Sequence, residues 1–220
     1  KEITFKAPTG SGKTYMMADF MNRMLARQSD IVFLVSSLSK GDLAQQNYSK
    51  FCEYNQKKFF AHINPYLINS EIAGEERLFI PPYYNVYLLP RDLYKKGGRL
   101  MQGAMEAFLQ NLTHTILGGQ GKKVILIKDE CHIATKNLDN LNDVYFTKII
   151  NFSATPKLSR GQTPDVQIDE TSAVNAKLIK TVEWGLDTDT VEDAIKKFES
   201  IKEDYRNKLG VNPCLIIQIS

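Results

Sequence analysis

The amino-acid sequence predicts an α/β fold with a mainly parallel sheet flanked by helices, on the strength of two observations. First, short runs rich in β-branched and aliphatic residues have the composition of strands that are buried on both faces. Second, segments with the apolar spacing of amphipathic helices separate these runs, notably residues 13–26 and 42–54. Strands that alternate with helices are typical of a parallel sheet with right-handed crossovers. The predicted strands are residues 2–6, 31–35, 85–89, 123–129 and 148–154.

The first predicted strand leads into the segment APTGSGKT, which has the pattern of a phosphate-binding loop. Ala7 occupies the position in which the first glycine of that pattern is usually written. Gly10 and Gly12 would let backbone N–H groups close around phosphate oxygens, and the helix that follows offers its positive end. Lys13 would reach the outer phosphates, and Thr14 could bind Mg²⁺. A chance loop is the alternative, which the flanking strand and helix disfavour.

The predicted strand at residues 123–129 ends in an acidic pair, Asp129 and Glu130. Ligands of open α/β sheets bind at the carboxyl ends of the strands. There Asp129 can hold Mg²⁺ through water, and Glu130 can orient and deprotonate an attacking water. Solvated acids at the end of a strand are the alternative. The next predicted strand runs into Ser153 and Thr155, whose hydroxyls we expect beside the acidic pair.

The rest of the chain is less regular. Between residues 55 and 120 we expect loops, insertions and short helices, and residues 159–167 have the Gly and Pro of a surface connection. The clearest helix spans residues 190–209, with Thr190 as its N-cap and Gly210 at its end. The chain lacks an initial Met and stops inside the apolar run CLIIQIS, so we expect it to be a fragment of a longer protein.

Composition excludes several classes of protein. With 220 residues, 43% of them apolar and 24% charged, the chain is expected to fold rather than to be disordered. The net charge of +3 is compatible with nucleic-acid binding but does not demand it. The cysteines form no CxxC pair, which predicts reduced thiols rather than a zinc site or a disulfide framework. No run is long enough to span a membrane, and we expect a cytoplasmic location.

In this order and spacing, APTGSGKT, DECH and SAT resemble motifs I, II and III of superfamily 2 helicases and translocases. More narrowly, the segments FKAPTGSGKTYMMADF, DECHIATKNLDNL, IINFSATPKLSRGQTPDV and PCLIIQIS resemble the Res (restriction) subunit of type III restriction-modification enzymes. The resemblance implies a RecA-like P-loop NTPase domain. It places the first lobe at residues 1–158, a connecting segment and helix at 159–210, and the start of a truncated second lobe, its first strand, at 211–220.

The resemblance also implies a role for each matching residue at the nucleotide site. ATP would be the nucleotide and Mg²⁺ its metal, held by Thr14 and Asp129. Lys13 and Glu130 would be catalytic, with Glu130 acting on the water. The triphosphate would be held by Gly10, Ser11, Gly12, Lys13 and Thr14.

Further roles concern coupling and nucleic acid. The resemblance implies that His132 contacts Ser153 or Thr155 and links the state of the nucleotide to DNA; alone, such a histidine would be structural or on the surface. Contacts to DNA phosphates would come from Ser36, Ser37, Gln45 and Arg91. A helix N-cap and an exposed helix face are the alternative for the first three residues, and a solvated loop is the alternative for the last.

Taken together, the resemblance implies an ATP-hydrolysing DNA translocase or helicase motor domain of a type III restriction endonuclease subunit. Its partners would be double-stranded DNA, the modification methyltransferase subunit, and the second lobe and nuclease domain of the same chain. Because the arginine finger of such motors lies in the second lobe, this chain alone should be a weak ATPase. The alternatives are another superfamily 2 helicase, acting in DNA repair or on RNA, and a non-motor P-loop protein that binds nucleotide as a switch.

Overall fold

The computed structural model of the chain describes residues 2–37, 43–68, 80–90, 93, 104–114, 121–130, 144–179 and 190–215. It divides into two compact units, residues 1–179 and 180–220. The first unit contains the sheet and the predicted nucleotide site. The second contains one long helix.

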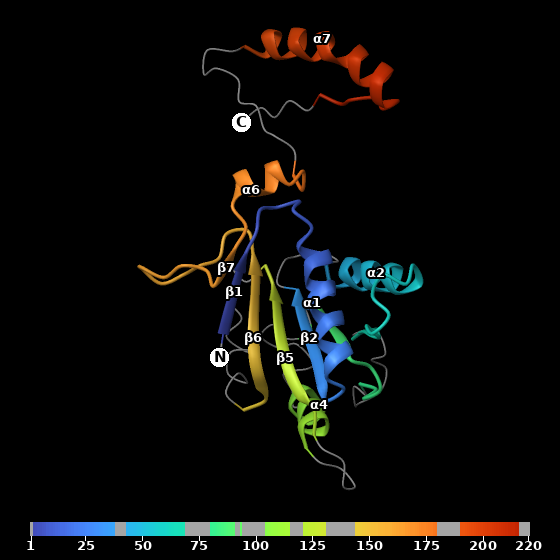
Figure 1. Cartoon of the computed structure of the whole chain (residues 1–220), viewed down its shortest axis with the longest axis vertical. Helices are drawn as coiled ribbons and strands as arrows, with labels where there is room; N and C mark the ends of the chain where they lie inside the picture. Colours follow the sequence, from blue (N-terminus) through green and yellow to red (C-terminus); the bar gives the residue numbers. More distant parts are fainter. Residues whose placement is uncertain are drawn as a thin grey trace. The chain divides into compact units, whose positions relative to one another are not determined.

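Among the described residues, the first unit has a seven-stranded sheet in the order β3-β4-β2-β5-β6-β1-β7, and every pairing is parallel (Figure 1). Parallel pairing brings the carboxyl ends of all strands to one edge of the sheet. The strands are β1 (Glu2–Lys6), β2 (Ile31–Ser37), β3 (Pro65–Leu67), β4 (Val86–Pro90), β5 (Lys123–Asp129), β6 (Phe146–Ser153) and β7 (Val166–Gln167).

The predicted parallel sheet is confirmed, and the five predicted strands are β1, β2, β4, β5 and β6, with ends displaced by two residues at most. The sequence does not predict β3 and β7, which have three and two residues. Such short strands show no periodicity, and they form because a neighbouring strand offers backbone partners. β7 lies inside the predicted surface connection 159–167 and pairs with Phe5 and Lys6 of β1.

The described helices are α1 (Lys13–Arg27), α2 (Leu43–Gln56), α4 (Ala104–Thr113), α6 (Glu170–Asn175) and α7 (Val191–Leu209). Of the helices in the first unit, α1 and α2 pack against one face of the sheet and α4 packs against the other. The first two coincide with the helical segments predicted from apolar spacing to within two residues. Of the helices described, none is long and apolar enough to cross a membrane.

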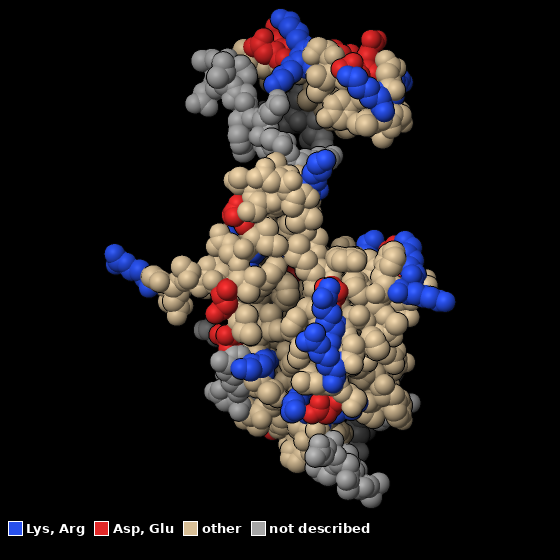
Figure 2. Space-filling model, in the orientation of Figure 1, with Lys and Arg blue, Asp and Glu red and all other residues tan. Residues whose placement is uncertain are grey.

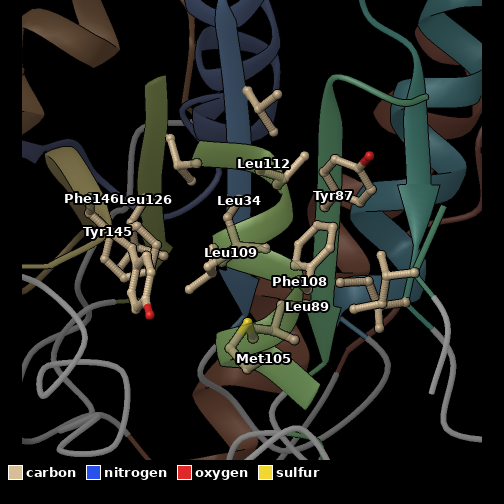
Figure 3. Close-up of a cluster of buried hydrophobic side chains, with 14 of the residues drawn as sticks. Leu34, Tyr87, Leu89, Met105, Phe108, Leu109, Leu112, Leu126, Tyr145 and Phe146 are labelled. Atoms are coloured by element: carbon tan, nitrogen blue, oxygen red, sulfur yellow. The ribbon is translucent and has the colours of Figure 1, made fainter. Parts of the chain in front are cut away.

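The core explains why residues 31–35 of β2 are apolar on both faces instead of alternating with polar residues. All seven residues of β2 are buried. On one face of the sheet, Phe33 belongs to an apolar cluster with Met17 of α1 and Phe51 of α2. On the other face, Leu34 belongs to a second cluster with Leu109 of α4, shown in Figure 3. A strand covered on both faces is apolar throughout instead of alternating, and this is how the sequence pattern identifies it.

The second unit contains α7, which begins and ends as the sequence predicts. The Thr190 hydroxyl accepts a hydrogen bond from the Asp193 N–H at 3.2 Å, and the Asp193 carboxylate accepts one from the Thr190 N–H at 3.0 Å. This reciprocal capping box satisfies two backbone donors of the first turn. Gly210 follows the helix in the left-handed conformation with φ 64°, which a glycine adopts without steric cost.

Candidate functional site

The loop between β1 and α1 has the geometry of a phosphate-binding turn. Gly10 and Gly12 have φ of 80° and 86°, in the left-handed region that glycine tolerates. Gly12 is the N-cap of α1, so no capping side chain occupies the N–H groups of the first turn. Ala7 is fully buried, and its N–H donates to the carbonyl of Ser153 at 3.2 Å. The start of the loop is thereby tied to the end of β6.

Two side chains close this loop on itself. The Ser11 hydroxyl donates to the carbonyl of Pro8 at 2.7 Å, and the Ser11 side chain is buried. The Lys13 ammonium donates to the same carbonyl at 3.2 Å and to that of Ala7 at 3.4 Å. Backbone carbonyls carry only partial charge, so phosphate oxygens would be stronger partners for the ammonium group. The lysine is therefore placed where an anionic ligand of the loop would meet it.

The acidic pair lies at the carboxyl end of β5. Asp129 is 7% exposed, and Glu130 has a φ of 60°, a conformation uncommon for a residue other than glycine. Burial raises the pKa of the Asp129 carboxyl. A hydrogen bond from the Asn47 amide lowers this pKa in part, the charge of Glu130 raises it, and the charge of Lys13 lowers it. The acid pair and the loop lysine therefore interact electrostatically.

Asn47 of α2 joins these two parts of the site, although it lies outside every motif in the sequence. Its side-chain amide donates to Asp129 Oδ2 at 3.0 Å, and its carbonyl oxygen accepts from the Thr14 hydroxyl at 3.4 Å. A signal for it exists in the sequence, because Asn47 lies four residues after Leu43 and four before Phe51, on the predicted apolar stripe of the helix. A polar residue on a buried stripe needs a polar partner.

A cavity of about 690 Å³ opens between the loop, the acid pair and α2. It is lined by Gly12, Lys13 and Thr14 on one side and by Asp129 and Glu130 on another. Its volume is within the range of small-molecule and cofactor sites, roughly 300–1,000 Å³. The cavity therefore combines the ammonium group of Lys13, side-chain oxygens that can bind a cation, and the N–H groups at the start of α1. Together these groups suit a nucleotide with its cation.

Of the three residues predicted to couple the nucleotide to DNA, Ser153 and Thr155 lie near the phosphate-binding loop. Ser153 is fully buried, and its hydroxyl accepts from the Thr155 N–H at 3.1 Å. The backbone contact between Ser153 and Ala7 places this turn next to the phosphate-binding loop. His132 lies outside the described residues, so its predicted contact with Ser153 or Thr155 stays a prediction.

The residues predicted to meet DNA differ in their surroundings. The Ser36 hydroxyl donates to the carbonyl of Ile127 at 3.4 Å, and the Ser37 hydroxyl accepts from Asn47 at 3.5 Å; both serines are buried. Gln45 is exposed and donates to the Ser49 hydroxyl. Arg91 lies outside the described residues. On the face drawn in Figure 2, Asp and Glu side chains lie among the Lys and Arg side chains, in agreement with the small net charge.

Replacing Asp129 by Asn is expected to stabilise the ligand-free chain at pH 7. The raised pKa means that folding disfavours the ionised carboxylate, and this penalty is complete above the folded-state pKa and absent below the unfolded-state pKa. The difference in the free energy of unfolding between the variant and the original chain should therefore shrink as the pH falls from the folded-state pKa to the unfolded-state pKa. We expect thermal denaturation to give a Tm higher by about 2–4 °C, or roughly 1 kcal/mol for a chain of this size.

The matched control is Asp204→Asn in α7, where the carboxylate is 66% exposed and pairs with Lys208. Because exposed ion pairs contribute little, its Tm should change by less than about 1 °C. A lower Tm for the Asp129 variant at pH 7 would contradict the assigned cost of the buried charge.

The loop, the acid pair and the parallel sheet together define a P-loop nucleotide hydrolase of the RecA-like class. Residues 1–158 match the family described as type III restriction enzyme, res subunit, and the chain belongs to this family. It is accordingly a helicase-type ATPase motor domain. Such domains use a nucleotide, typically with Mg²⁺, and the oxygen donors of Thr14 and Asp129 suit that hard cation.

Solved structures that resemble the chain include two nucleic-acid motor proteins. The UvsW helicase from bacteriophage T4 is 17% identical, with a TM-score of 0.42, and the match covers 70% of this chain and 46% of that one. The Sulfolobus solfataricus SWI2/SNF2 ATPase core in complex with dsDNA is 15% identical, with a TM-score of 0.42 and coverages of 70% and 28%. The chain thus spans less than half the length of either. No curated protein matches the sequence.

Proposed function

We propose that this chain is the first RecA-like lobe of the ATP-driven DNA translocase or helicase motor in a type III restriction endonuclease subunit. Residues 1–158 would form this lobe, residues 159–210 the connecting segment and helix, and residues 211–220 the start of a second lobe. The observation that carries the proposal is one cavity lined by Lys13 and Thr14 on one side and by the acid pair on another. The family of the chain supports the restriction role.

Each residue of the cavity has a chemical role in this proposal. Thr14, and Asp129 through water, would hold Mg²⁺, which would supply neutralisation of phosphate charge. Lys13 would bind the outer phosphates. Glu130 would orient a water and accept its proton as the water oxygen bonds to the γ-phosphorus, while the bond to the β-phosphate oxygen breaks and ADP leaves. Gly10, Ser11 and Gly12 would hold the triphosphate through the backbone of the loop.

DNA would be bound at the same edge of the sheet. Ser36, Ser37, Gln45 and Arg91 are the proposed contacts to DNA phosphates. Because Ser36 and Ser37 are buried in the described structure, their contact requires a rearrangement at the end of β2. His132, with Ser153 and Thr155, would transmit the state of the nucleotide to these residues. The buried link from Ser153 to Ala7 of the loop supports this route.

The proposed partners are double-stranded DNA, a modification methyltransferase subunit, and the second lobe and nuclease domain of the same protein. In related P-loop nucleotide hydrolases an arginine finger accelerates hydrolysis by about 10³–10⁵-fold, so the 220-residue chain should bind nucleotide and hydrolyse it slowly. The competing functions are a superfamily 2 helicase of another pathway and a nucleotide-binding switch without motor activity.

The test is ATP hydrolysis by the longest natural chain that carries this domain, measured as phosphate release with duplex DNA, single-stranded DNA or RNA. Duplex DNA is expected to stimulate hydrolysis most. Stimulation by RNA alone would overturn the restriction role, and hydrolysis that responds to no nucleic acid would favour the switch. A Lys13→Ala variant serves as the control for activity from another site, because it lacks the ammonium group that meets the outer phosphates.

A further inference from the structure

We propose that Asn47 is a positioning residue of the nucleotide site, which orients Thr14 and Asp129 for a shared Mg²⁺ ion. This inference rests on the proposed function, because it takes a magnesium nucleotide as the ligand of the cavity. Asn47 is not among the residues that the motif pattern marks. It comes from α2, whereas its partners come from the start of α1 and the end of β5.

The contacts use most of the hydrogen-bonding capacity of the amide. Asn47 is 4% exposed. Its Nδ2 donates to Asp129 Oδ2 at 3.0 Å and lies 3.5 Å from Ser37 Oγ, and its Oδ1 accepts from Thr14 Oγ1 at 3.4 Å. An asparagine side chain has two donor hydrogens and one carbonyl oxygen, so this one group satisfies partners of both kinds. Neither an aspartate nor a leucine of similar size could do so.

Strand geometry explains why these partners converge on α2. Side chains alternate between the two faces of a strand, so Asp129 continues the row of Ile125 and Ile127, which faces α1 and α2. Ser37 continues the corresponding row of β2, and the two residues are register partners in the parallel pairing. The carboxyl ends of β2 and β5 therefore present polar groups to the same buried stripe of α2.

The direction of each hydrogen bond favours metal binding. Thr14 donates its only hydroxyl hydrogen to Asn47, which leaves the oxygen lone pairs available to a cation. Asp129 accepts from Asn47 through Oδ2, so the Asn47 amide engages only one of the two carboxylate oxygens. Partners of this kind fix the orientation of metal ligands, and their loss typically costs about 10–100-fold in metal affinity. Asn47 is placed to act in this way on both predicted ligands.

The experiment measures binding of a fluorescent ADP analogue to the 220-residue chain, first without metal and then during a Mg²⁺ titration. The main variant is Asn47→Leu, which keeps the size of the side chain and removes its polar atoms. We expect metal-free affinity to stay within about threefold of the original, because the loop backbone and Lys13 are unchanged. The Mg²⁺ concentration that produces half of the metal-dependent change in affinity for the ADP analogue should rise at least about tenfold.

The matched control is Asn55→Leu, the same change about two turns further along α2, where the amide donates to the carbonyl of Ile63 instead of to the site. It should leave the Mg²⁺ titration unchanged. A second variant, Asn47→Ala, removes the amide without adding apolar volume at its position. Thermal denaturation shows whether each variant folds, and loss of folding in both Asn47 variants would assign the residue to stability alone and overturn the proposal.

The outcomes separate this inference from the proposed function. If the unmodified chain binds no nucleotide, or binds it without any response to Mg²⁺, the proposed function fails. If the unmodified chain responds to Mg²⁺ and Asn47→Leu responds in the same way, only the role of Asn47 fails. A parallel loss of affinity with and without metal would likewise overturn the positioning role, because it would indicate a distorted loop.

Discussion

Replacing Glu130 by Gln is expected to lower ATP turnover at least a hundredfold in the DNA-stimulated protein and to leave nucleotide affinity within about threefold. A general base contributes about 10²–10⁴-fold to such a reaction, and the glutamine amide cannot accept the proton of the attacking water. Binding should persist because Lys13 and the glycines of the loop are untouched. Phosphate release measures turnover, and retention of labelled ATP on a filter measures binding. ATP should accumulate on the variant without being hydrolysed.

Glu53 supplies the matched control for this variant. It also lines the cavity, but its carboxylate pairs with Lys50 at 3.0 Å and with Lys57 at 2.7 Å, on the α2 side. Glu53→Gln should change turnover less than about twofold, because the Glu53 carboxylate is paired with the two lysines and has no part in the proposed proton transfer. Unchanged hydrolysis by the Glu130 variant would remove Glu130 from the role of base. Equal losses in both variants would indicate a general effect of charge in the cavity.

Replacing Phe33 by Ala is expected to destabilise the chain by about 3–5 kcal/mol. Phe33 lies at the middle of β2, has no solvent exposure, and packs edge-to-face with Phe20 of α1 at a centroid distance of 6.0 Å. It pairs in register with Val86 on one side and Ile125 on the other, so the surrounding sheet cannot easily collapse into the vacated space. Urea denaturation measures the loss through a lower midpoint.

Phe59 provides a control of the same chemistry, because it is 57% exposed just after α2. Phe59→Ala should change the free energy of unfolding by less than about 0.5 kcal/mol. If both variants lost the same stability, the apolar cluster between the sheet, α1 and α2 would not be the core that positions the nucleotide site. Helix α1 packs in that cluster and begins with Lys13 and Thr14 of the candidate site. Phe33→Ala should therefore also weaken nucleotide binding at urea concentrations near the denaturation midpoint of the variant.

Much of this fold could be predicted because its signals are local. β2 and β5 each contain a continuous apolar run, and the capping box at Thr190 is identified from residues three positions apart. β3 and β7 could not be predicted, because strands of two or three residues depend on what β4 and β1 offer at the edges of the sheet. In the candidate site, the glycines and Lys13 could be identified because one short segment contains them all.

The sequence by itself determined that this protein has a loop with the phosphate-binding pattern after its first strand and an acid pair after a buried strand. Each of these features lies within a few consecutive residues, and their chemistry follows from residue type and spacing. Only the tertiary structure decided that Asn47 connects them. Its partners Thr14 and Asp129 are 33 and 82 residues away along the chain. The order of strands in the sheet, the alternation of side chains along β5 and the packing of α2 bring the three together.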